Sequence, residues 1–261
     1  MLNQLFSMNG KVCVVTGGSR GLGYFIAKGF LAAGAKRVYI TARKTQDCID
    51  AAKQLSELDG AQGECIALPG NLSSMQDIGT LVAELNSRES SLDVLVNNAG
   101  TGWLEPLESF SEKGWNRVMD LNVKAPFFLT RELVPLLAQD KAIKNTASVI
   151  NIGSSSGICA QTDTFSYSPS KAAIHQVTRN LAVELCDKHI RVNAIAPGRF
   201  ITKMTAYVEK DQYEKEIALM PLNRWGEESD INGVAIMLAS SAGEFITGQI
   251  LPVDGGTTLV K

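Results

Sequence analysis

An apolar run that opens directly into a glycine-rich turn restricts the possible folds of this 261-residue chain more than any other feature. Residues 11–16 read KVCVVT, and residues 17–23 read GGSRGLG. A short apolar run of this kind is typical of a strand buried on both faces, as in a parallel sheet. Apolar residues at helical spacing then cover residues 21–33, and Gly34 ends the predicted helix. The chain therefore begins with a predicted strand–loop–helix unit.

The alternation of strand and helix continues along the whole chain. Seven strands are predicted, at residues 11–16, 37–42, 64–68, 92–97, 147–153, 190–196 and 249–252. Helices are predicted at residues 21–33, 46–58, 74–88, 111–138 (with Ser111 as N-cap), 165–188, 203–219 and 228–239. This pattern predicts an α/β fold, a single doubly wound (Rossmann) domain over residues 1–261 with a seven-stranded parallel sheet and helices on both faces. Residues 198–225 depart from the alternation, and we predict that they form a substrate lid.

Composition narrows the classes of function. Hydrophobic residues make up 45% of the chain and charged residues 20%, close to the globular average, and a net charge of −2 does not favour nucleic-acid binding. The five cysteines are scattered without a CxxC pair, which favours reduced thiols, and the two histidines lack partners for a metal site. The N-terminus does not resemble a signal peptide, and no apolar stretch reaches the roughly 20 residues that cross a bilayer. We expect a soluble cytoplasmic protein with no membrane partner.

The glycine-rich turn indicates a phosphate site, because it lies between a predicted strand and a predicted helix. Glycines let the backbone approach an anion closely, and the N–H groups at the start of the helix face that anion. The spacing is GxxxGxG, unlike the GxGxxG of other dinucleotide folds. A tight turn without a ligand is the alternative. We predict cofactor contacts from the loop residues Gly17, Ser19, Arg20, Gly21, Leu22 and Gly23.

The end of the second predicted strand indicates which dinucleotide binds. An NAD site usually places a carboxylate there, whereas an NADP site tolerates an arginine. Residues 41–44 read TARK, with no acid, and Arg20 in the glycine loop can reach the same phosphate. Arg43 is the favoured anchor because arginine pairs with phosphate bidentately. We therefore predict NADP(H); the alternative is that Arg43 and Lys44 are only solvated surface charges.

A phenol and an ammonium four residues apart form the second chemical signal. Tyr167 and Lys171 share one face of a predicted helix. We expect the ammonium to lower the pKa of the phenol, ordinarily about 10, so that it can exchange a proton with a carbonyl oxygen. Ser154 can donate a hydrogen bond to that oxygen, with Ser155 and Ser156 as rivals on composition alone. These residues and the glycine loop together predict an oxidoreductase.

Taken in order along the chain, these motifs resemble the short-chain dehydrogenase/reductase family. The matching segments are TGGSRGLG (16–23), NNAG (97–100), LNV (121–123), the set Ser154…Tyr167-x-x-x-Lys171, PG (197–198) and DGG (254–256), and they span almost the whole chain. The resemblance implies that Tyr167 is the proton donor, assisted by Lys171, and that Ser154 polarises the carbonyl. It also implies that Asn122 anchors a water in a proton relay.

The same resemblance implies further cofactor contacts. Lys171 would hold the nicotinamide ribose beside Tyr167, and Thr202 would contact the nicotinamide carboxamide. The other implied contacts come from Asn71, Leu72, Asn98, Ala99, Gly100, Pro197 and Gly198. Asn71 stands where the family often has an aspartate facing the adenine, and an amide can still accept a hydrogen bond from an exocyclic amine.

Within this family the chain is similar to the 3-oxoacyl-(acyl carrier protein) reductases, especially the subgroup associated with rhamnolipid synthesis, through NNAGTGW, IAPGRF and LNRWG. This similarity implies an NADPH-dependent carbonyl reductase for a 3-oxoacyl thioester of CoA or acyl carrier protein, in a homodimer or homotetramer. The alternatives are a reductase or dehydrogenase of another small ketone, sugar or alcohol, and a non-catalytic NADP-binding sensor. The apolar residues of the predicted lid either accept an acyl chain or simply pack an amphipathic helix: Met204, Tyr207, Tyr213, Ile217 and Met220.

Overall fold

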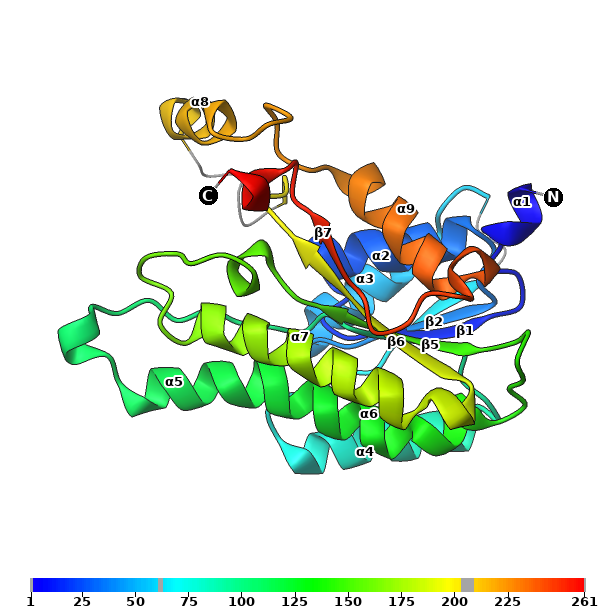
Figure 1. Ribbon diagram of the computed structural model, residues 1–261. Helices are drawn as coiled ribbons and strands as arrows, with labels where there is room; N and C mark the ends of the chain where they lie inside the picture. Colours follow the sequence, from blue (N-terminus) through cyan, green and yellow to red (C-terminus); the bar gives the residue numbers. More distant parts are fainter. Residues whose placement is uncertain (1, 61–62, 203–208, 261) are drawn as a thin grey trace.

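One seven-stranded parallel sheet forms the centre of the computed structural model, which describes residues 2–60, 63–202 and 209–260 (Figure 1). The strands lie in the order β3-β2-β1-β4-β5-β6-β7, and every neighbouring pair is parallel. They are β1 (Val12–Val15), β2 (Arg37–Ile40), β3 (Glu64–Ala67), β4 (Val94–Asn97), β5 (Ala147–Ile152), β6 (Ile190–Pro197) and β7 (Ile250–Val253). The predicted α/β fold and its parallel sheet are confirmed.

The strand order reverses at β1, which pairs with β2 on one side and with β4 on the other. Open parallel sheets bind their ligands at such a point, beyond the carboxyl ends of the strands. Here the segments that follow the two strands are tied together, because the Thr16 hydroxyl accepts hydrogen bonds from the backbone N–H groups of Asn98 and Ala99, both at 2.9 Å. The fold therefore fixes two loops beside each other at the edge where a ligand is expected.

Helices cover both faces of the sheet (Figure 1). Three bury apolar residues on one face: α2 (Gly21–Ala32), α3 (Thr45–Ser56) and α9 (Glu228–Ala239). Three pack against the opposite face: α4 (Met75–Arg88), α6 (Ala125–Ala138) and α7 (Tyr167–Glu184). The other helices with α geometry are α1 (Leu2–Leu5), α5 (Glu112–Met119) and α8 (Lys210–Ala218). Short 3₁₀ turns cover Leu107–Ser109, Ser155–Gly157, Cys186–Lys188, Ser241–Gly243 and Thr257–Leu259.

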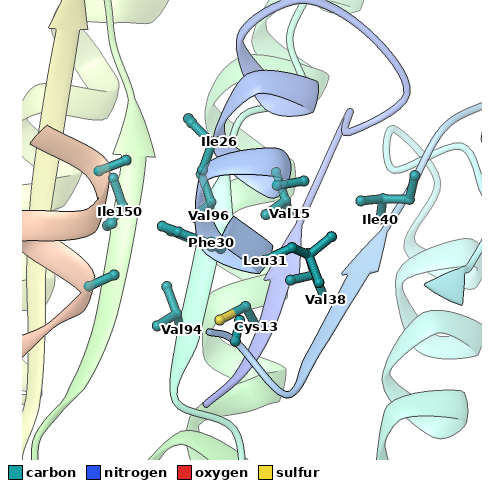
Figure 2. Packing of buried hydrophobic residues seen from close by; sticks show 14 of the residues in the cluster. Cys13, Val15, Ile26, Phe30, Leu31, Val38, Ile40, Val94, Val96 and Ile150 are labelled. Atoms are coloured by element: carbon teal, nitrogen blue, oxygen red, sulfur yellow. The ribbon is translucent and has the colours of Figure 1, made fainter. Parts of the chain in front are cut away.

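The apolar strands are continuous in sequence because both of their faces are buried. In β1, Cys13 and Val15 belong to the core under α2, α3 and α9, whereas Val12 and Val14 belong to the core under α4, α6 and α7. Figure 2 shows the first of these cores, where Phe30 of α2 packs against the strands. Alternate residues of one strand therefore hold the two helical layers to a single sheet.

The predicted helix over residues 111–138 consists of three parts. Ser111 caps α5 as expected, because its hydroxyl accepts a hydrogen bond from Gly114 N at 3.1 Å. A π-helical turn at Asp120–Lys124 then separates α5 from α6. Apolar spacing alone does not reveal this turn, since a single wider turn leaves the helical periodicity on either side intact.

Two other predicted helices differ from the structure at their ends. The helix predicted over residues 165–188 ends as α7 at Glu184 and is followed by a 3₁₀ turn. Of the helix predicted over residues 203–219, the structure describes α8 (Lys210–Ala218), and the lid residues Met204 and Tyr207 lie outside the described residues. None of the helices in the described part of the chain has the length and apolar character needed to cross a membrane.

Candidate active site

The glycine loop turns sharply between β1 and α2. Gly17 and Gly21 adopt left-handed conformations, with φ values of 67° and 59°, which glycine accepts without strain. Arg20, the residue that precedes α2, is extended, and its side chain makes no capping hydrogen bond to the helix. The first N–H groups of α2 are thus not capped by that side chain, and an anion is the natural partner for such groups.

Gly23 shows why the loop needs its third glycine. A Cβ at this position would lie 2.4 Å from Asn98 Nδ2 and 2.5 Å from the carbonyl oxygen of Gly17. Asn98 uses the same Nδ2 to donate hydrogen bonds to Thr16 O at 2.8 Å and to Gly17 O at 3.1 Å. Gly23 does not line the cleft described next, so its contribution to that cleft is the close packing of α2 against the two loops.

A cleft of about 490 Å³ runs along the carboxyl end of the sheet. Most of the residues predicted to contact a cofactor line it: Gly17, Ser19, Arg20, Gly21, Leu22, Arg43, Leu72, Asn98, Ala99, Gly100, Tyr167, Lys171, Pro197, Gly198 and Thr202. Asn71 does not line it. The Asn71 side chain accepts a hydrogen bond from Ser73 N at 3.4 Å, which closes a local turn, while its neighbours Gly70 and Leu72 face the cleft.

Three cations and one carboxylate gather at one end of the cleft. Arg20, Arg43 and Lys44 line it, together with Asp47 from the first turn of α3. Lys44 Nζ lies 3.9 Å from Asp47 Oδ2, a loose and exposed ion pair. The end therefore keeps a positive balance, which suits a phosphate. Asp47 was missed in the sequence because it lies seven residues after the end of β2 at Ile40, beyond the position where a ribose-binding acid is expected.

The opposite end of the cleft brings together the predicted phenol, ammonium and hydroxyl. Tyr167 begins α7, Lys171 follows one turn later, and Ser154 lies two residues after the end of β5. All three line the cleft, and the Ser154 hydroxyl is hydrogen-bonded to Tyr167. Lys171 is buried, donates a hydrogen bond from Nζ to Ile152 O at 2.8 Å, and has Nζ 5.6 Å from the centroid of the Tyr167 ring.

The pKa of Tyr167 lies above its ordinary value, which differs from the sequence-based expectation. Burial raises this pKa, and the hydrogen bond from Ser154 and the positive charge of Arg199 offset only part of the effect. Lys171 is not among the groups that shift this pKa; burial lowers its own pKa to about 8, and its Nζ donates its hydrogen bond to Ile152 O. The site therefore holds Tyr167 in its protonated form at neutral pH.

The positions of Ser154, Ser155 and Ser156 indicate which of the three hydroxyls can contact a ligand in the cleft. All three serines are buried, but only Ser154 lines the cleft, whereas Ser155 and Ser156 lie in the 3₁₀ turn that follows it. Ser156 fixes the Ser154 hydroxyl, which accepts a hydrogen bond from Ser156 N at 3.1 Å and lies 3.1 Å from Ser156 Oγ. Of the three hydroxyls, that of Ser154 is thus the one placed to meet a ligand.

Asn122 lies in the π-helical turn and does not line the cleft. Its buried side chain accepts a hydrogen bond from Thr101 N at 2.9 Å and donates to Thr101 O at 2.9 Å and to Ser170 Oγ at 3.0 Å. The side chain thereby joins the loop after β4 to α7, one residue before Lys171. The π turn, absent from the sequence prediction, is what carries Asn122 to this position.

Arg199 and Phe200 also line the cleft; both belong to the predicted lid over residues 198–225, but neither was singled out as a site residue. They follow directly on the Pro197–Gly198 pair that the sequence did single out, so proximity to that motif was the available signal.

Comparison with known proteins agrees with this geometry. The family model described as enoyl-(acyl carrier protein) reductase matches residues 17–258. The chain belongs to the short-chain dehydrogenase/reductase family, whose members are oxidoreductases that use NAD(P). It is 46% identical over 258 residues to the rhamnolipids biosynthesis 3-oxoacyl-(acyl-carrier-protein) reductase of Pseudomonas aeruginosa, covering 98% of this chain and 99% of that protein.

Two further relatives show the range of the similarity. The 5-keto-D-gluconate 5-reductase of Escherichia coli K12 is 34% identical over 259 residues, covering 98% of each chain. The solved Pseudomonas aeruginosa RhlG/NADP active-site complex superposes with a TM-score of 0.93 at 45% identity, covering 98% of this chain and 99% of that one. The similarity thus extends over the whole length of reductases for two different kinds of ketone.

Proposed function

We propose that the protein is an NADPH-dependent carbonyl reductase whose substrate is a 3-oxoacyl thioester. The observation that carries the proposal is one cleft with the glycine loop and three cations at one end and Ser154, Tyr167 and Lys171 at the other. The loop fits a dinucleotide phosphate because the uncapped start of α2 faces it, and Arg43 and Arg20 fit a 2′-phosphate. When bound, NADPH would supply the hydride.

The chain's own residues perform the proton chemistry. Tyr167 donates its phenolic proton to the carbonyl oxygen as negative charge develops there, and the Ser154 hydroxyl donates a hydrogen bond to the same oxygen. The raised pKa of Tyr167 suits this direction, because the phenol must hold its proton until the carbonyl needs it. Lys171 donates to Ile152 O and contributes positive charge beneath the phenol, which stabilises the phenolate left after transfer.

The choice of a 3-oxoacyl thioester rests on the 46% identical Pseudomonas reductase, since the site itself requires only a ketone. The second candidate is a keto sugar acid, which the 34% identical gluconate reductase supports. A non-catalytic sensor is disfavoured because the phenol, ammonium and hydroxyl are all retained and meet in the cleft.

A substrate panel tests the proposal. NADPH oxidation is followed with acetoacetyl-CoA, with longer 3-oxoacyl thioesters, with 5-keto-D-gluconate and with simple ketones. We expect the thioesters to give the highest kcat/KM, and Tyr167→Phe to lose about 10²–10⁴-fold in rate while still binding NADPH. Reduction of the keto acid alone would replace the substrate assignment but keep the reductase. NADPH binding without turnover of any carbonyl would refute the enzyme.

The remaining expectations belong to the same proposal. We place the enzyme in the cytoplasm, supported by the burial of three of its unpaired thiols, those of Cys13, Cys48 and Cys65. We propose a homodimer or homotetramer, supported by apolar side chains that lie exposed on α5, α6 and α7. We also propose that an acyl carrier protein can deliver the thioester. Residues 198–225 would cover the substrate, and four of these residues line the cleft: Gly198, Arg199, Phe200 and Thr202.

A further inference from the structure

Arg199 occupies the catalytic end of the cleft without a part in the proton transfer just described. It lines the cleft together with Ser154 and Tyr167. Its backbone is fixed, because Gly226 N donates to Arg199 O at 2.9 Å and Phe200 forms a parallel bridge with Gly226. The guanidinium therefore extends into the cleft region from a rigid base.

The partner of Arg199 is held loosely. Arg199 Nε lies 3.3 Å from Glu216 Oε2 on α8, and the arginine side chain is 60% exposed. Glu216 Oε2 is buried, yet in the described part of the chain it has no hydrogen-bond partner, so the contact with Arg199 is an ion pair without hydrogen-bond geometry. Because Glu216 Oε2 is buried, an anion that displaces it must make stronger contacts with Arg199 than Glu216 does. The charge-assisted hydrogen bonds that this ion pair lacks are such contacts.

The charge of Arg199 also acts on Tyr167, the proposed proton donor. Its positive charge lowers the pKa of Tyr167, against the larger effect of burial. A guanidinium presents a planar fork of N–H donors that matches a carboxylate or a phosphate. A ligand that reaches Tyr167 with its carbonyl can thus offer an anionic group to Arg199 in the same cleft.

We propose that Arg199 binds an anionic group on the carbonyl substrate and exchanges the Glu216 carboxylate for it. The inference rests on the proposed function and adds the substrate class, which is a ketone that carries a carboxylate or a phosphate. A keto acid supplies the carboxylate, and the carrier arm of a CoA thioester supplies the phosphate. Arg199 is then a specificity-determining residue, and Glu216 acts through it by competing with the substrate.

Two matched pairs of ketones test the exchange and distinguish the two anions. Acetoacetyl-CoA is compared with the N-acetylcysteamine thioester of acetoacetate, which has the same ketone without phosphates. In parallel, 5-keto-D-gluconate is compared with L-sorbose, which has the same ketone and hydroxyl configuration without the carboxylate. The quantity measured is the ratio of kcat/KM between the anionic and the neutral member of each pair. The pair whose ratio responds to the variants identifies the anion.

Opposite charge changes should move this ratio in opposite directions. In Arg199→Gln we expect it to fall about tenfold or more, mainly through KM of the anionic member, because a charge-assisted hydrogen bond is lost. In Glu216→Gln it should rise, because the competing carboxylate is gone. Arg199→Lys should keep part of the preference. Glu214→Gln is the matched control, since Glu214 lies on the same helix and pairs with Lys210 at 3.7 Å rather than with Arg199.

The possible outcomes distinguish a failure of this inference from a failure of the proposed reductase function. If Arg199→Gln slows anionic and neutral ketones equally, or if neither variant changes the ratio, Arg199 does not bind a substrate anion while the carbonyl reductase stands. If the unmodified enzyme reduces none of the four ketones, the proposed function and the inference both fail. NADPH binding, followed by its fluorescence, shows that each variant is folded.

Discussion

At the scale of single residues, Lys171 and Arg43 are two cations of the cleft that differ in the cost of keeping their charge. Lys171 is 5% exposed and its burial lowers its pKa to about 8, so the fold stabilises the charged form poorly. Arg43 is exposed at the far end of the cleft, where its charge is kept at little cost. In the proposed function, Lys171 therefore lowers the stability of the fold but serves the reaction, and Arg43 selects the cofactor.

The burial of Lys171 should be visible in stability measurements. We expect Lys171→Met to raise the free energy of unfolding of the cofactor-free protein at pH 7 by about 1–3 kcal/mol, since one pKa unit corresponds to about 1.4 kcal/mol. The folded pKa is below the unfolded value of 10.5, so the cost is fully present below pH 8 and disappears as the pH rises from 8 towards 10.5.

Urea unfolding at pH 7 and at pH 10 measures this difference. The advantage of Lys171→Met should shrink at the higher pH. Lys53→Met provides the control, because Lys53 has 74% of its side chain exposed on α3. A difference between Lys171→Met and the unmodified protein that does not depend on pH would contradict the assignment of the cost to the buried charge.

The charges at the other end of the cleft should set the cofactor preference. We expect Arg43→Ala to weaken NADPH binding about tenfold or more, and NADH binding much less, because only NADPH carries a 2′-phosphate for a charge-assisted hydrogen bond. Asp47→Asn should change the preference in the opposite direction. Fluorescence titration with both nucleotides measures the two affinities. Equal losses for NADPH and NADH in Arg43→Ala would show that the phosphate lies elsewhere.

The sequence predicted those site residues that belong to short motifs and missed those that tertiary structure brings in. The glycine loop, Tyr167 and Lys171 were accessible because spacing within one element determines their geometry. Asp47 was not, since it reaches the cleft only through the packing of α3. Arg199 was included only as part of the predicted lid, since its place in the cleft depends on the bridge at Phe200. The pKa of Tyr167 was predicted in the wrong direction, because burial, which the sequence does not show, outweighs the neighbouring charges.

At the scale of elements, the position of α2 depends on how closely it approaches the loops after β1 and β4. Gly23 is the point of closest approach, and any side chain there would meet Asn98 and the carbonyl of Gly17. In the segment over residues 111–138, by contrast, the helical path itself changes. The π turn at Asp120–Lys124 adds a residue to one turn and thereby shifts Asn122. Helix existence follows from apolar spacing, but these local displacements depend on the neighbouring elements.

Gly23→Ala tests the packing of α2. We expect the free energy of unfolding to fall by about 1–3 kcal/mol, as is usual for overpacking, and NADPH affinity to fall with it because the loop must shift. Gly79→Ala is the matched control within α4, where a Cβ meets nothing within 4 Å. It should instead stabilise the protein by up to about 1 kcal/mol through helix propensity. Similar effects of the two substitutions would remove the special role of Gly23.

At the scale of the whole molecule, the helices on one face of the sheet leave several large apolar side chains exposed. On the side of α4, α6 and α7, large apolar side chains reach the surface: Trp115 on α5, Phe127 on α6 and Val183 on α7. Figure 1 shows these helices running beside one another along the molecule. Such positions suit contacts with a second copy of the chain, because homo-oligomers form mainly through self-complementary faces.

Charge introduced on this face should dissociate the oligomer. We expect the unmodified protein to sediment as a dimer or tetramer, and the double variant Phe127→Lys/Val183→Lys to sediment at a lower mass. Ile143→Lys provides the control, since Ile143 is 77% exposed in the segment between α6 and β5. Sedimentation equilibrium gives the masses. An unmodified protein that is monomeric at micromolar concentration would contradict the proposed assembly.

The reversal of strand order at β1 has a consequence for how such a protein can be altered. The residues that we propose select the dinucleotide follow β1 and β2, whereas those that we propose act on the carbonyl follow β5 and β6. These two sets of residues come from separate segments of the sequence, and the sheet brings them together along its carboxyl edge. We therefore expect cofactor preference to change when the segments after β1 and β2 are exchanged, and substrate range to change when the segments after β5 and β6 are exchanged, with the strands themselves kept.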